Sequence, residues 1–175
     1  TRVPLALCAI AVMGTYGCPG PASSPASTAP GTAAPPAAGA PDPKAILAAY
    51  TTDAFVKVNA TGINGTGPHT AGKPLFIYVD KAHAALYKKA VAGPMPEGTT
   101  IVKVSAEGPG ALVAIMKKLK AGTDPGAGDW YFWEQLGSSV PFDGNATKGG
   151  WLCFSCHKGA PANADHLLGT AVFGQ

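Results

Sequence analysis

Residues 97–110 read EGTTIVKVSAEGPG, and this stretch decides the fold class. Between its glycines, β-branched residues alternate with a period of two, which predicts a strand rather than a helix. One face of that strand carries Thr99, Ile101, Lys103 and Ser105, and the other carries Thr100, Val102 and Val104. A lysine therefore shares a face with an apolar residue of the predicted core.

Similar signals extend in both directions from this strand. Segments at about 55–58, 75–79, 111–119 and 129–135 predict four more strands, the last two joined through the turn AGTDPGAG. Short helices are predicted at about 43–52, where Asp42 can cap and Pro43 suits the first position, and at about 81–91 after Asp80. We therefore expect a mainly β domain, an antiparallel sheet or sandwich of about five strands with two or three short helices.

The first 41 residues have a different character. Residues 1–18 contain Arg2, an apolar run, and small residues ahead of Cys18, which is typical of an export signal of the lipoprotein type. Residues 19–41 consist only of Pro, Gly, Ala, Ser and Thr and predict a disordered tether. We expect a folded domain over 42–175 that faces an oxidising compartment such as the periplasm, either anchored through a lipid on Cys18 or released by ordinary cleavage.

The charge pattern excludes one class of partner. Thirteen basic and ten acidic residues give a net charge of +3, and they are scattered without a basic stripe or interleaved aromatics. Nucleic-acid binding is therefore not expected, and contact with a membrane is expected only through a lipid on Cys18.

The motif CFSCH at residues 153–157 carries the chemistry. In such a motif Cys153 and Cys156 can bond to a haem while His157 supplies an imidazole to the iron, and the three lie on one side of a helix. Zinc would need further ligands at finger spacing, and a thioredoxin-like redox pair would need a βαβ pattern. Neither is evident, so the sequence favours one covalent haem c at the C-terminal end of the domain.

A second side-chain ligand to the iron would make the chain an electron-transfer cytochrome. The residues able to supply one have a simpler interpretation as core or surface groups, and none lies in a typical ligand loop. They are Met95, Met116, His69, His83 and His166.

Three segments together resemble a known family. YVDKAHAALYKKAVAGPMPEGTTIVKV, AGTDPGAGDWYFWE and CFSCHKGAPANAD, in this order, resemble cytochrome P-460 and the related cytochromes c′-beta over about residues 75–170. The resemblance implies a mainly β, commonly homodimeric fold whose haem keeps one iron position open. Cytochromes P-460 oxidise hydroxylamine, whereas the c′-beta proteins bind nitric oxide or carbon monoxide.

The resemblance also implies roles for individual residues. Lys103 matches the lysine that is joined covalently to the porphyrin in cytochrome P-460. The strand expected to carry a distal glutamate has Val113 or Ala114 at that place, and Leu75 replaces a distal arginine. With Met95 these residues predict an apolar distal lining, which favours a small gas or nitrogen-oxide ligand over hydroxylamine oxidation.

Overall fold

The computed structural model describes residues 41–64, 74–89, 93–105, 111–160 and 165–167. The predicted signal, Cys18, almost all of the tether and His69 lie outside these residues. Among the described residues no helix has both the length and the hydropathy of a membrane span.

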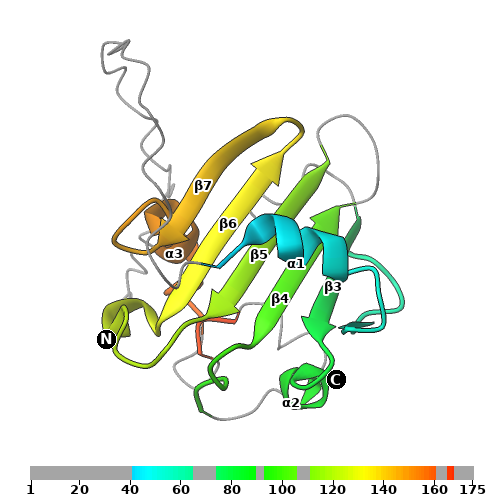
Figure 1. Cartoon of the computed structure of the whole chain (residues 1–175), viewed down its shortest axis with the longest axis horizontal. Helices are drawn as coiled ribbons and strands as arrows, with labels where there is room; N and C mark the ends of the chain where they lie inside the picture. Colours follow the sequence, from blue (N-terminus) through cyan, green and yellow to red (C-terminus); the bar gives the residue numbers. More distant parts are fainter. Residues whose placement is uncertain (1–40, 65–73, 90–92, 106–110, 161–164, 168–175) are drawn as a thin grey trace, which may run out of the picture. The chain divides into compact units, whose positions relative to one another are not determined.

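A single antiparallel sheet forms the centre of the described part (Figure 1). Its main path is β1-β3-β4-β5-β6-β7, and β2 is a second partner of β3. The strands are β1 Phe55–Lys57, β2 Ile63–Asn64, β3 Pro74–Asp80, β4 Thr100–Ser105, β5 Leu112–Lys118, β6 Trp130–Leu136 and β7 Ser139–Asn145. The five predicted strands are confirmed, and within the described residues they form one sheet rather than a sandwich.

Two further strands, β2 and β7, were not predicted. Strand β7 contains Pro141 and Gly144, which are depleted in strands and hide its pattern in the sequence. Among the described strands it lies at one end of the path and pairs with β6 alone. An edge strand tolerates proline because a missing N–H on its open side breaks no ladder bond.

Three helices occur where helices were predicted, namely α1 Pro43–Ala49, α2 Ala84–Lys88 and α3 Trp151–His157. The predicted turn between β5 and β6 contains the short 3-10 helix η2 Pro125–Ala127. Asp42 caps α1 as expected, since its Oδ1 accepts hydrogen bonds from the backbone N–H groups of Lys44 and Ala45. Helix α2 is shorter than predicted. Asp80 binds His83 and the Thr100 N–H instead of capping a helix at residue 81.

The two faces of the sheet pack against different helices. Helix α1 lies across the front of the sheet in Figure 1, where Ile46 packs against Val102, Ile115, Tyr131 and Trp133. On the other face, α2 and α3 cover a second cluster. That cluster includes Ile77, Val79, Tyr87, Ile101, Met116, Trp130 and Phe132, with Cys153 and Phe154 packed against it.

Candidate functional site

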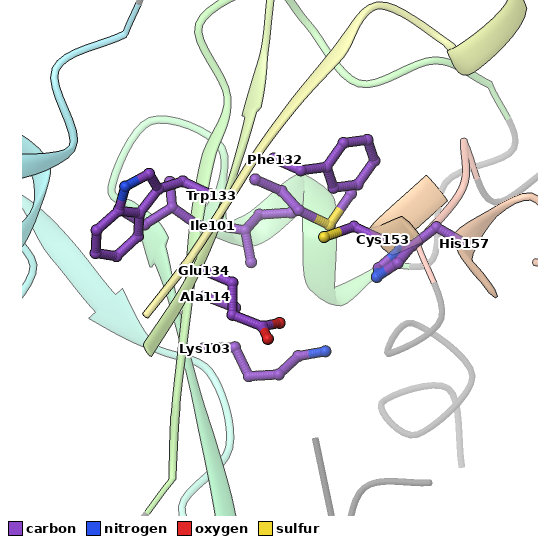
Figure 2. A pocket seen from close by; sticks show the side chains of 10 residues that line it. Ile101, Lys103, Ala114, Phe132, Trp133, Glu134, Cys153 and His157 are labelled. Carbon is purple, nitrogen blue, oxygen red and sulfur yellow. The ribbon is translucent and has the colours of Figure 1, made fainter. Parts of the chain in front are cut away.

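A small pocket lies between the sheet and α3 (Figure 2). Strands β4, β5 and β6 form one wall, and α3 forms the other. The lining residues are Ile101, Lys103, Ala114, Ile115, Met116, Phe132, Trp133, Glu134, Cys153 and His157.

Helix α3 brings the motif residues to the pocket. Cys153 and His157 are four residues apart, so they lie on one face of the helix, and both line the pocket. Phe154 anchors the helix, since its ring lies 6.5 Å from that of Phe132 and 5.1 Å from that of His166. Cys156 is exposed beside this face, and both cysteines are free thiols.

His157 is held as a neutral imidazole. It is buried, and burial lowers its pKa to about 4, an effect that the hydrogen bond to His166 partly opposes. Its Nδ1 lies 2.8 Å from the backbone carbonyl oxygen of His166. Because a carbonyl only accepts, Nδ1 carries the proton and donates it, which leaves Nε2 with a lone pair. This is the state in which histidine binds a metal.

Lys103 and Glu134 face α3 from the sheet. Lys103 is opposite Ala114 in the β4–β5 ladder, and Ala114 is opposite Glu134 in the β5–β6 ladder. The three residues therefore form one row across the sheet, in which the small Ala114 leaves space between the two charged side chains. Figure 2 shows the amine and the carboxylate both reaching toward Cys153 and His157.

Burial and mutual attraction act on this pair in opposite directions. Burial lowers the pKa of Lys103, and the charge of Glu134 raises it again in part. Burial likewise raises the pKa of Glu134, and Lys103 lowers it in part. The pocket thus holds an acid and a base that are both easier to neutralise than they would be in water.

Glu134 is a charged pocket residue that was not predicted from the sequence. Strand 111–119 carries no carboxylate, as its sequence shows, but the neighbouring strand β6 brings one to this pocket. Alternation along the strand contained the signal, since Trp130, Phe132 and Glu134 share a face. What the sequence did not show is that this face of β6 lies opposite the CFSCH helix.

The structure brings four of the predicted site residues together, namely Lys103, Ala114, Cys153 and His157. Leu75 is on the same face of the sheet but pairs with Ser105, outside the lining. Val113 does not belong to the lining. Neighbours on a strand point to opposite faces, and Val113 packs on the α1 side.

The candidates for a second iron ligand are spread over several places. Met116 lines the pocket, and Met95 is buried in the core cluster beside it. His83 binds Asp80 through Nδ1, at 2.7 Å, and the ring of His166 packs edge-on against Phe154. Met116 is therefore the one of these four that reaches the pocket lining.

Two features of the described residues bear on zinc and on a redox pair, the alternatives to haem. Among the described residues, no group of three His, Cys, Asp or Glu side chains is arranged to hold a metal ion. Burial raises the pKa of the Cys153 thiol to about 12, and the charge of Glu134 adds to this effect. A reactive redox pair requires a lowered thiol pKa, so this environment opposes thioredoxin-like chemistry.

A scan of the chain against protein-family models finds no match, and a search of curated proteins also finds none. What the pocket binds must therefore be inferred from the chemistry of its own residues.

Proposed function

We propose that this chain is a c-type haem protein of the cytochrome P-460 and c′-beta kind, with an iron site that binds nitric oxide or a related small nitrogen species. The observation that carries the proposal is the state of His157. It is buried and neutral, its Nδ1 is engaged by the His166 carbonyl, and it shares a helix face with Cys153 at the pocket.

The residues at α3 fit a covalently attached haem. Cys153 and Cys156 would form the thioether bonds, and His157 would provide a nitrogen ligand to the iron. The free thiols, three residues apart on one helical turn, suit attachment to one porphyrin edge. Bound haem would supply an iron with one position for His157 and another for an exogenous ligand.

The sheet wall supports a small ligand. Ile101, Ala114 and Phe132 offer apolar surface, which favours a neutral diatomic molecule over a hydrated ion. Lys103 and Glu134 add one donor and one acceptor at the same wall. Such a pocket can hold a small, weakly polar molecule and orient it by a single hydrogen bond.

Hydroxylamine oxidation is the second candidate function, and Glu134 is the observation that favours it. Oxidation of hydroxylamine releases protons, and a carboxylate at the pocket can accept them. The raised pKa of Glu134 brings it closer to the working range of a general base. The sequence argued against this function because strand 111–119 lacks a carboxylate. Glu134 of the neighbouring strand β6 supplies a carboxylate at the pocket, which supports this candidate.

Lys103 remains the candidate for a covalent bond to the porphyrin. Its side chain is on the pocket side of β4, and burial lowers its pKa. A neutral amine is the nucleophilic form, which this environment favours. The C–N bond would replace one N–H and one C–H bond, so its formation would also require a two-electron oxidant such as a peroxide. A mass difference between the wild type and Lys103→Met after haem attachment, beyond that of the substitution itself, would support the bond.

We also propose that the chain is exported, and that Cys18 receives a lipid. Both proposals rest on residues 1–41, and export agrees with the compartment in which c-type haem is attached. Labelling with a radioactive fatty acid tests the anchor: wild type should be labelled and Cys18→Ser should not be. Equal labelling of the two proteins would contradict it.

The haem proposal is tested by producing the full chain together with a haem-attachment system in an oxidising compartment. We expect one haem per chain by mass and by the spectrum of the reduced pyridine adduct. Cys153→Ala together with Cys156→Ala should abolish covalent attachment, whereas His83→Ala should leave it unchanged because His83 binds Asp80 away from the pocket. A wild-type chain that carries no haem would contradict the proposal.

Carbon monoxide then distinguishes an open iron site from a closed one. A shift of the ferrous spectrum on adding the gas supports ligand binding, whereas an unchanged spectrum means a six-coordinate electron-transfer cytochrome. Met116→Leu tests the side chain that would close the site. If Met116 ligates the iron, this variant should gain the shift that the wild type lacks.

The enzyme candidate needs its own measurement. With hydroxylamine and an electron acceptor, Glu134→Gln should lower turnover by about 10²-fold or more, the usual contribution of a general base. Glu97→Gln, at an exposed position, is the matched control and should retain wild-type turnover. Wild-type turnover no higher than that of free haem would exclude the oxidase and leave ligand binding as the function.

A further inference from the structure

The described segment 165–167 lies directly behind His157 and is held by three distant parts of the chain. The Asp165 carboxylate binds Lys118 of β5, and its Oδ2 also accepts a hydrogen bond of 2.7 Å from the Met95 N–H. The Trp130 indole N–H of β6 donates to the Asp165 carbonyl at 2.9 Å. These contacts place the next carbonyl, that of His166, against His157 Nδ1.

The ion pair at the centre of this arrangement is buried. Lys118 Nζ lies 2.8 Å from both carboxylate oxygens of Asp165 and 2.6 Å from the Gly128 carbonyl oxygen, and the two charged side chains are 8% and 7% exposed. A buried pair is weak evidence for stability, because desolvation offsets much of the attraction. Its directional contacts can nevertheless hold a segment in one position.

The backbone at this place is strained. Asp165 and His166 have φ angles of +46° and +64°, a left-handed conformation that is unfavourable for residues with a Cβ. Such a conformation persists where surrounding contacts outweigh its cost. Gly128 packs against the same segment, and a Cβ at this position would lie 2.7 Å from the His166 Cδ2.

We propose that Lys118 and Asp165 are positioning residues for His157. They hold residues 165 and 166 in the left-handed conformation that aims the His166 carbonyl at Nδ1. This hydrogen bond selects one tautomer and one ring orientation, with Nε2 directed to bind the metal. The proposal rests on the proposed function for the role of His157, but the positioning itself exists in the chain without haem.

The first test therefore uses the full chain produced without haem-attachment machinery. In protein labelled with ¹⁵N-histidine, wild-type His157 should show a protonated Nδ1 and an unprotonated Nε2. In Asp165→Ala and in Lys118→Met the carbonyl loses its fixed position, so His157 should show an average of both tautomers. Unchanged His157 signals in these variants would overturn the proposal.

Two further variants separate positioning from general loosening. Val102→Ala removes buried volume on the opposite face of the sheet, against α1, and should lower stability without moving the His157 signals. If Val102→Ala moves them as much as Asp165→Ala does, the proposal is overturned. Should Asp165→Ala fail to fold, Asp165→Asn keeps the side-chain size and the preference for a positive φ, and should give a smaller shift in the same direction.

The second test uses the haem-loaded protein. Loss of the Nδ1 hydrogen bond lowers the basicity of the imidazole, so Lys118→Met should lower the iron–histidine stretching frequency and raise the midpoint potential. Equal frequencies in Lys118→Met and wild type would overturn positioning even where haem is bound. A chain without haem would instead defeat the proposed function, and the ¹⁵N measurement would still decide the role of Lys118 and Asp165.

Discussion

The two faces of the sheet are built from neighbouring residues, and yet they have different chemistry. On the face toward α1, Val102, Ile115 and Trp133 pack in an apolar cluster. On the face toward α3, the adjacent Lys103, Ala114 and Glu134 line a pocket with Cys153 and His157. Both faces have an apolar cluster, but the α3 face also carries a row of polar side chains beside its cluster, and the α1 face does not at the neighbouring positions.

This division has a physical basis in the cost of buried charge. An ammonium or carboxylate within an apolar cluster loses its hydration with no partner, which is expensive. On the α3 face, Lys103 and Glu134 oppose each other across Ala114, and each offsets part of the other's cost. Substitutions and pH changes that act on one face test this difference, from the largest expected effect to the smallest.

A lysine at position 102, one residue before Lys103, would lie on the apolar α1 face and should destabilise the protein. Val102 is fully buried, so Val102→Lys places an ammonium in the apolar cluster with no counter-charge. We expect a loss of about 4 kcal/mol in the free energy of unfolding, measured by urea denaturation. The swap Val102→Lys/Lys103→Val has the wild-type composition and should be as unstable. A stable swap variant would show that the faces are interchangeable.

The α3 face should make the haem-free protein sensitive to acid through His157. The pKa of His157 is lowered from 6.5 to about 4 in the folded state, so between these values the unfolded chain binds the extra proton. The free energy of unfolding should therefore fall as the pH drops from 6.5 to about 4, by about 3 kcal/mol. The pKa of Glu134 is raised, so its protonation stabilises the folded protein as the pH falls and opposes the effect of His157. The contribution of His157 is therefore measured as the difference in unfolding free energy between wild type and His157→Gln at each pH. Parallel pH profiles for wild type and this variant would contradict the prediction.

The pair Lys103 and Glu134 should show strong coupling in a double-mutant cycle. Glu134→Leu leaves Lys103 without its counter-charge in the pocket, and we expect it to cost about 2 kcal/mol of unfolding free energy. Lys103→Met/Glu134→Leu should recover most of that loss, because neither charge then remains. Additive effects in urea denaturation would show that the two side chains do not interact.

The smallest effect should come from the cap of α1. Asp42→Ala removes the acceptor for the N–H groups of Lys44 and Ala45, which should cost about 1 kcal/mol of unfolding free energy. Because α1 covers the apolar face, haem attachment and the ¹⁵N signals of His157 should remain as in wild type. Asp42→Asn, which can still cap, should be nearly neutral.

Much of the fold was predictable because its signals are local. Alternation of apolar and polar residues identified β3, β4, β5 and β6, and the cap at Asp42 located α1. The helical spacing of Cys153 and His157 also placed both on one face. Strand β7 escaped prediction because its proline and glycine are tolerated at an edge position that only the assembled sheet reveals.

The site was predictable only in part. Lys103, Cys153 and His157 were identified from the sequence, but Glu134 was not, because nothing local shows that β6 runs beside β5 opposite α3. Alternation shows that Val113 and Ala114 point to opposite faces of the sheet, but only the packing of α1 and α3 shows that Ala114 is on the pocket side.

The sequence by itself determined five of the strands, the helix that carries CFSCH and the residues from which haem attachment is proposed. The tertiary structure alone decided that Glu134 joins Lys103, and that the His166 carbonyl orients His157 through Lys118 and Asp165, which are 47 residues apart. The reason is physical: periodicity and capping act between near neighbours along the chain, whereas the pairing of charges and the aim of a carbonyl depend on elements that packing brings together.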